Sequence, residues 1–199
     1  MTDPRDDFGR AAAAFCGVVE QIDDDQWGLP GLGEWTVREL VGHALRAVQT
    51  AASALDSPAD AAALSSPGEY FRAALTIPDL NAAVAERGRE SGRDLGADPV
   101  ARVRSEVETA VARVSVADLD EVISVIVGSI RLRDYLPTRI FELVAHTDDI
   151  CRAVDVENLM PADLVLIALV TALGLYADDE RLGLLRQLTG RGAATSPLN

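Results

Sequence analysis

The chain has 199 residues, 48% of them apolar, which is enough for one ordinary domain with a sizeable hydrophobic core. Its formal net charge is −14, all of its cationic residues are arginines, and it has no basic run, so we expect no nucleic-acid partner. The N-terminus has no apolar targeting segment, and the most apolar stretch, residues 164–176, is shorter than the ~20 residues of a bilayer span. We therefore expect no membrane partner and a cytoplasmic location.

The first predicted helix begins after Asp3 and Pro4, a capping residue followed by a first-turn proline. Apolar residues then recur at spacings of four and three, namely Phe8, Ala12, Phe15, Val19 and Ile22. This pattern predicts an amphipathic helix that ends near the acidic run at 23–25. The segment "WGLPGLGEW" at 27–35 follows, a turn with a tryptophan at each end that we expect to fold back onto the helices.

A capping box opens the second predicted helix. Thr36 and Glu39 have the T-x-x-E spacing in which each side chain accepts a hydrogen bond from a backbone N–H of the first turn, so the helix is predicted to begin at Val37. Its apolar stripe consists of Val37, Leu40, Val41, Ala44, Val48 and Leu55. His43 lies at the edge of this stripe, where a side chain can point inward.

The middle of the chain contains one departure from helical periodicity. A loop at 57–69 is rich in serine, proline and alanine, and the segments 70–92 and 99–114 after it are predicted to be helical. The segment "EVISVIVGSIRL" at 121–132 is instead a β-branched run interrupted by glycine and serine. This composition is typical of a short extended hairpin.

Helical periodicity returns at about Asp134, and two further apolar segments at 162–176 and 180–189 close the chain. The elements together predict an all-α fold. The simplest architecture is a four-helix bundle with the terminal helices packed on one side.

Two of the predicted helices carry side chains that can ligate a metal. Glu142 and His146 are one helical turn apart and leave the same face, while His43 is on the other helix. Two imidazoles and a carboxylate are ligands that a divalent cation such as zinc accepts, and three protein ligands leave a fourth position for water or substrate. Arg139 and Asp149 flank the pair on the same helix, at positions from which each can orient a ligand.

The same residues have other interpretations. Glu142 and His146 also fit a surface ion pair, and a histidine near an apolar stripe, such as His43, is often a satisfied core residue. Arg139 and Asp149 also fit solvated charges. The two histidines could instead ligate a haem between the helices, although no haem motif accompanies them.

Other kinds of site have little support. The chain has no G-x-S-x-G motif for a nucleophilic serine and no glycine-rich phosphate loop that opens a helix. Cys16 and Cys151 are far apart in the sequence and lack C-x-x-C spacing, so we expect small buried hydrophobes rather than a disulfide or a reactive thiol.

Two segments resemble the mycothiol-dependent maleylpyruvate isomerase family, a branch of the DinB/YfiT-like bundle proteins. They are "DDDQWGLPGLGEWTVRELVGHAL" at 23–45 and "LRDYLPTRIFELVAHTDDICRAV" at 132–154. In that family a Trp-Thr-Val turn leads into a helix with a histidine ligand, and a later helix bears R-x-x-E-x-x-x-H-x-x-D, whose Glu and His complete a zinc site. The ending "LLRQLTGR" at 184–191 is also similar to family members, so the resemblance covers about residues 6–191.

The resemblance implies a DinB/YfiT-like four-helix bundle with a short extended hairpin before the last bundle helix and extra C-terminal helices. We expect residues 1–158 to form the metal-binding bundle and residues 159–199 to form a helical extension packed on it. A homodimer is compatible with this organisation.

The resemblance also implies the ligands and the cosubstrate. His43, Glu142 and His146 match the family's metal ligands, with zinc as the expected metal, and Arg139 and Asp149 match the flanking family positions. A thiol in the open coordination position loses its proton and becomes a nucleophile. In the family this thiol is mycothiol, so the implied partners are a small-molecule thiol and an electrophile.

Two outcomes of that chemistry are compatible with the resemblance, namely isomerisation and S-transfer. The family's isomerases have a C-terminal α/β domain that contributes an arginine to the active site, whereas the residues after Asn158 in this chain are predicted to be helical. A zinc-dependent thiol transferase is therefore the preferred hypothesis. The alternative is a non-catalytic metal-binding protein that acts in sensing or interaction, and a coordination position open to a pocket would favour the enzyme.

Overall fold

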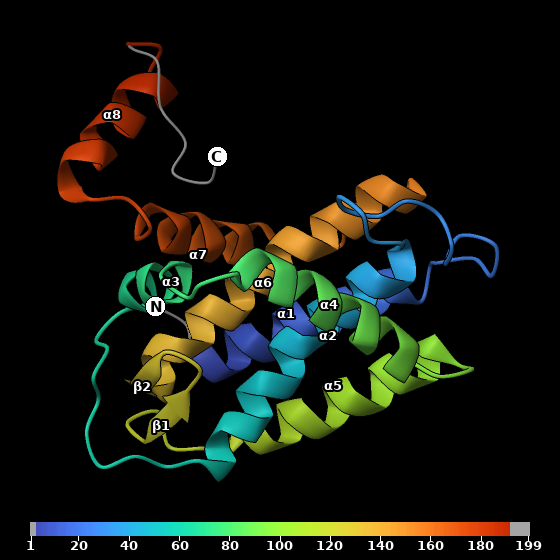
Figure 1. Cartoon of the computed structure of the whole chain (residues 1–199), viewed down its shortest axis with the longest axis horizontal. Coiled ribbons are helices and arrows are strands. Elements are labelled where there is room, and N and C mark those ends of the chain that lie inside the picture. Colours follow the sequence, from blue (N-terminus) through green and yellow to red (C-terminus); the bar gives the residue numbers. More distant parts are fainter. Residues whose placement is uncertain (1–2, 192–199) are drawn as a thin grey trace.

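Four helices form the core of the molecule in the computed structural model, which describes residues 3–191 (Figure 1). They are α1 (Pro4–Val19), α2 (Val37–Ser53), α5 (Pro99–Ser115) and α6 (Leu132–Val154). Helices α1 and α2 each pack against both α5 and α6, which closes the bundle. The prediction of an all-α bundle is confirmed.

The remaining elements cover the bundle. Helix α4 packs along α2, α7 packs along α6, and α3 contacts both α6 and α7. A two-stranded antiparallel hairpin precedes α6, as predicted, and pairs Val122 with Arg131 and Val125 with Gly128. The bounds are α3 (Pro67–Leu75), α4 (Leu80–Asp94), α7 (Ala162–Leu173), α8 (Asp178–Leu188), β1 (Val122–Val125), β2 (Gly128–Arg131) and a 3-10 turn η1 (Ala54–Asp56).

The predicted starts of α1 and α2 agree with the structure. Asp3 caps α1 by accepting a hydrogen bond from the Arg5 backbone N–H at 2.9 Å. The Thr36 hydroxyl accepts from the Glu39 backbone N–H, and the Glu39 carboxylate accepts from the Thr36 N–H at 2.8 Å, so the predicted capping box is present. These caps satisfy backbone donors that the first helical turn leaves unpaired.

The structure corrects several predicted boundaries. Helix α3 begins at Pro67, inside the loop expected at 57–69. The single helical segment expected at 70–92 is two helices, α3 and α4, because Pro78 has no amide hydrogen and Asp79 adopts a left-handed conformation with φ of 54°. The first helix ends at Val19, earlier than predicted, just before an acidic run whose charges are unfavourable at a helix C-terminus. Ile22 is nevertheless buried, in the turn that follows.

The C-terminal segment keeps an apolar outer surface. Helix α7 buries Leu164 and Ala168 but exposes Leu166, Leu169 and Val170, and α8 projects from the body of the molecule (Figure 1). Within residues 3–191, no helix combines the length and the apolar character that a membrane crossing requires. The last part of the predicted extension, residues 192–199, lies outside the described residues.

Helices α2 and α4 approach each other closely at a pair of glycines. A Cβ atom at position 42 would lie 2.5 Å from the backbone nitrogen of Gly92 and 2.5 Å from the carbonyl carbon of Ser91. Because these obstacles are backbone atoms, a larger residue at position 42 forces the helices apart. The contact fixes α4 beside the residue that follows Gly42, which is His43.

We expect Gly42→Ala to lower the free energy of unfolding by about 1–3 kcal/mol, the usual cost of overpacking, although alanine is the better helix former. Urea denaturation monitored by circular dichroism measures this change. Gly183→Ala in α8 is the matched control, because a Cβ there meets nothing within 4 Å, and it should cause no loss. Equal stability of Gly42→Ala and the wild type would show that α4 shifts freely.

Candidate metal centre

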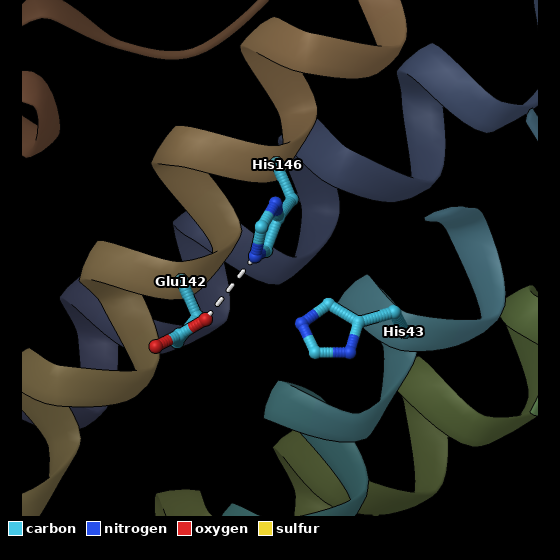
Figure 2. Close-up of side chains that lie close together, drawn as sticks. All are labelled: His43, Glu142 and His146. Carbon is cyan, nitrogen blue, oxygen red and sulfur yellow. Dashed lines mark ion pairs between the residues drawn. The ribbon is translucent and has the colours of Figure 1, made fainter. Parts of the chain in front are cut away.

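Helix α6 supplies two donors from one face. The Glu142 Oε2 and His146 Nε2 atoms are 3.3 Å apart, and the side chains of these residues are 24% and 15% exposed. Helix α2 supplies His43, whose ring centroid lies 4.8 Å from that of His146 with the planes nearly perpendicular. Figure 2 shows the three side chains pointing toward one another between the two helices.

The donor atoms of His43, Glu142 and His146 all lie within 4.8 Å of one another. Two donor atoms at 2.0–2.1 Å from one tetrahedral ion are about 3.4 Å apart. The distance between Glu142 Oε2 and His146 Nε2 already matches this value. Donor atoms that are as much as 4.8 Å apart reach it when one side chain turns toward the others. The three residues the sequence analysis selected are therefore brought together by the fold, in a geometry that a single ion can bridge.

Burial and charge act in opposite directions on His146. Burial of the ring lowers its pKa, but hydrogen bonds with Asp149 and Glu142 outweigh this effect and raise the pKa to about 9. For Glu142 the directions are reversed, because burial raises the pKa of a carboxyl group. The hydrogen bond with His146 and the charge of Arg139 outweigh burial, so the pKa of Glu142 is lowered overall. Without a metal, the two residues form a partly buried ion pair at neutral pH.

His43 is held in the opposite protonation state. Burial, followed by the positive charge of His146, lowers the pKa of His43 to about 4, so the ring is neutral at pH 7. Its Nδ1 atom is buried without a hydrogen-bond partner among the described residues. A neutral imidazole with an unused lone pair is the form of histidine that binds metals.

The two flanking residues have different roles. The Asp149 Oδ2 atom lies 3.2 Å from His146 Nδ1, so this carboxylate orients the ring from the side opposite Glu142. Arg139 forms no hydrogen bond with the three donors in the described structure. Its Nε donates to Thr138 Oγ1 at 3.0 Å, and its guanidinium lies 4.8 Å from the Tyr135 ring centroid, so it acts on Glu142 through its charge alone.

A pocket of about 530 Å³ opens beside the donors. His43 and Glu142 form part of its wall, and the rest comes from α2, α3, α4, α6 and the turn of the hairpin. Its volume is in the range of small-molecule sites. A small molecule in this pocket would contact the edge of the donor cluster.

The geometry argues against the competing interpretations. The low exposure of the His146 side chain is unlike that of a surface ion pair. The Nδ1 atom of His43 has no hydrogen-bond partner among residues 3–191, unlike that of a satisfied core histidine. The two imidazole centroids are only 4.8 Å apart with the rings edge to face, which leaves no room for a porphyrin between them.

Three aromatic residues near the site were not selected from the sequence. The Trp35 ring lies 4.6 Å from the His43 ring, and its Nε1 donates to the Ala85 carbonyl of α4 at 3.0 Å, which confirms that the turn folds back onto the helices. The Tyr70 and Tyr135 rings lie next to each other, with their centroids 5.5 Å apart, and both contact the Arg139 guanidinium. Burial raises the pKa of Tyr70 to about 12. Of these three residues, only Trp35 gave a sequence signal, as one of the two tryptophans of the turn.

A family model described as the mycothiol maleylpyruvate isomerase N-terminal domain matches residues 8–151 of the chain. The match extends from α1 to near the end of α6 and includes all three donors. No curated protein and no solved structure matches the chain.

The two histidines should titrate far apart in the metal-free protein. Nuclear magnetic resonance of the imidazole nitrogens should give pKa values of about 4 for His43 and about 9 for His146, and Asp149→Asn should lower only the second. Because the folded-state pKa of His146 exceeds the usual 6.5, its stabilising contribution is complete below pH 6.5 and is lost as the pH rises through about 9. Two titrations near 6.5 would contradict this account.

Proposed function

The chain belongs to the family of the mycothiol maleylpyruvate isomerase N-terminal domain, and from this premise we propose that it is a metal-dependent enzyme that uses a low-molecular-weight thiol as cosubstrate. His43, Glu142 and His146 are the proposed ligands. The observation that carries the proposal is the partly buried cluster of these donors, two of which line a pocket of about 530 Å³.

The donor chemistry favours zinc. Two imidazole nitrogens and one carboxylate oxygen form a common ligand set of catalytic zinc sites, in which a fourth position stays open. His43 needs no proton loss to bind, because its pKa of about 4 keeps it neutral. His146 has to release a proton, and Asp149 then keeps its ring oriented by accepting a hydrogen bond from Nδ1.

A bound divalent cation stabilises the thiolate form of a thiol in the open position, which supplies a nucleophile at neutral pH. The protein's own residues position the partners. The hydrogen bond with His146 and the charge of Arg139 favour the ionised form of Glu142. The apolar walls of the pocket limit the access of water to the reacting sulfur.

Two reactions fit this arrangement, with mycothiol as the proposed thiol. In S-transfer, a carbon–sulfur bond forms while the bond from the same carbon to a leaving group breaks with its electron pair. In isomerisation, the sulfur adds to an activated double bond, the resulting single bond rotates, and the carbon–sulfur bond breaks again. We favour S-transfer, because the segment after α6 forms helices α7 and α8 within the described residues.

Metal content tests the ligands. Protein purified without a tag or chelator should contain about one zinc per chain by elemental analysis, and His43→Ala, Glu142→Gln and His146→Ala should each lose it while circular dichroism stays unchanged. Glu90→Gln, which removes an exposed carboxylate of α4, is the control and should retain the metal. Retention of zinc by all three ligand variants would place the ion elsewhere.

Removal of the metal tests the reaction. The metal-loaded protein should accelerate the reaction of mycothiol with 1-chloro-2,4-dinitrobenzene, a neutral chromogenic electrophile. A chelator should reduce the rate to the uncatalysed value, and added zinc should restore it, because thiol ionisation depends on the cation. Zinc bound by the three residues without any acceleration for a panel of electrophiles would favour the non-catalytic alternative.

A further inference from the structure

Two arginines line the pocket beside the donor cluster. Arg46 follows His43 by one turn of α2 and therefore lies on the same face of that helix, and Arg87 comes from α4, which packs along α2. Both side chains are partly buried. The family motif that led to the metal ligands includes neither residue.

Neither guanidinium has a hydrogen-bond or ion-pair partner in the described part of the chain. Other arginines without a partner in this part of the chain, such as Arg152, are exposed to solvent. Arginines elsewhere form ion pairs, as Arg10 does with Asp163 at 2.7 Å and Arg113 with Asp56 at 2.6 Å. Partly burying a cation without a counter-charge costs free energy. Charged side chains in such unfavourable positions are found preferentially at binding sites, where a ligand supplies the counter-charge.

The pocket therefore has a positive charge within an acidic protein. Its charged lining consists of Arg46, Arg87, Arg139 and a single carboxylate, that of Glu142, which is already paired with His146. Arg139 is engaged by Thr138 and by two tyrosine rings. The guanidiniums of Arg46 and Arg87 are thus the groups available to an anion. The electrostatic field of like charges is strengthened in a pocket with apolar walls.

The remaining lining is mainly apolar and aromatic. Phe71 and Leu75 of α3, Val84 of α4, Phe141 of α6 and Ile126 of the hairpin turn all face the pocket. Surfaces of this kind bind an apolar body and leave orientation to a few polar groups. The occupant they fit has an apolar part and one anionic group.

We propose that Arg46 and Arg87 bind the carboxylate of an apolar electrophile and so determine which electrophiles react at the metal centre. The electrophilic character of the ligand rests on the proposed function, whereas binding of the carboxylate rests only on the pocket. Guanidinium and carboxylate form paired, charge-assisted hydrogen bonds that fix orientation. A substrate bound by its carboxylate has its apolar part in the pocket that His43 and Glu142 border.

Calorimetric titration with 4-phenylbutanoate and 4-phenylbutanamide, which differ mainly in charge, tests the proposal. It is made on the protein as purified and again after metal removal. We expect the acid to bind at least about tenfold more tightly than the amide in both states, as one charge-assisted pair provides. Arg46→Gln and Arg87→Gln should each weaken binding of the acid about tenfold and leave the amide unchanged.

Arg152→Gln is the matched control, because it removes the same charge from an exposed position of α6 outside the pocket, and it should leave both affinities unchanged. Equal binding of acid and amide, an equal effect of the control, or no binding of the acid at millimolar concentration would overturn the proposal. The proposal would also be overturned if the acid bound only to the metal-loaded protein and bound equally well to both arginine variants. The carboxylate would then be a metal ligand. The metal-free measurement does not depend on zinc, so the carboxylate can bind even if no metal-dependent reaction is found. A failure of the proposed function is therefore distinguishable from a failure of the carboxylate site.

Discussion

The packing of α2 against α6 is the constraint on which the rest of the molecule depends. It places His43 opposite Glu142 and His146 in a partly buried position, where polar groups are costly unless they are paired or bind a ligand. The close approach of α4 at Gly42 then fixes a third helix beside His43. One packing arrangement thereby positions the donor cluster, the Trp35 ring that covers His43 and the arginine of α4.

Burial alone would make both histidines neutral, yet they differ because their neighbours differ. His146 lies between two carboxylates and stays charged, whereas His43 faces a cationic ring and has no carboxylate of its own. The metal-free centre thus holds one ion pair and one vacant lone pair. A divalent cation that displaces the proton of His146 would leave the centre one unit more positive than before, which favours an anionic ligand in the open position.

The walls of the pocket come from segments that are distant in the sequence. The loop after η1 runs along the hairpin, with the Ser124 N–H donating to the Ser57 carbonyl at 2.7 Å and the Leu64 N–H to the Ser129 carbonyl at 2.9 Å. These bonds hold the hairpin turn at the pocket opposite the aromatic residues of α3. In our proposals the family motif supplies the metal ligands, whereas the groups that select a substrate, Arg46 and Arg87, lie outside that motif on α2 and α4.

The sequence by itself determined the helices of the bundle, the hairpin and the shared face of Glu142 and His146, because capping, periodicity and one-turn spacing are local properties. The placement of His43 beside this pair does not follow from local spacing, because His43 lies on another helix. The sequence predicted Thr36 as a cap and Glu142 and His146 on one face, and both agree with the structure. It did not separate α3 from α4, since the left-handed Asp79 between them is a single-residue conformation that periodicity does not reveal. Only the tertiary structure decided that His43 is neutral, that Arg139 acts through its charge, and that Arg46 and Arg87 lack partners. Each of these properties depends on which residues from other helices lie nearby, and sequence spacing within one helix does not predict contacts between helices.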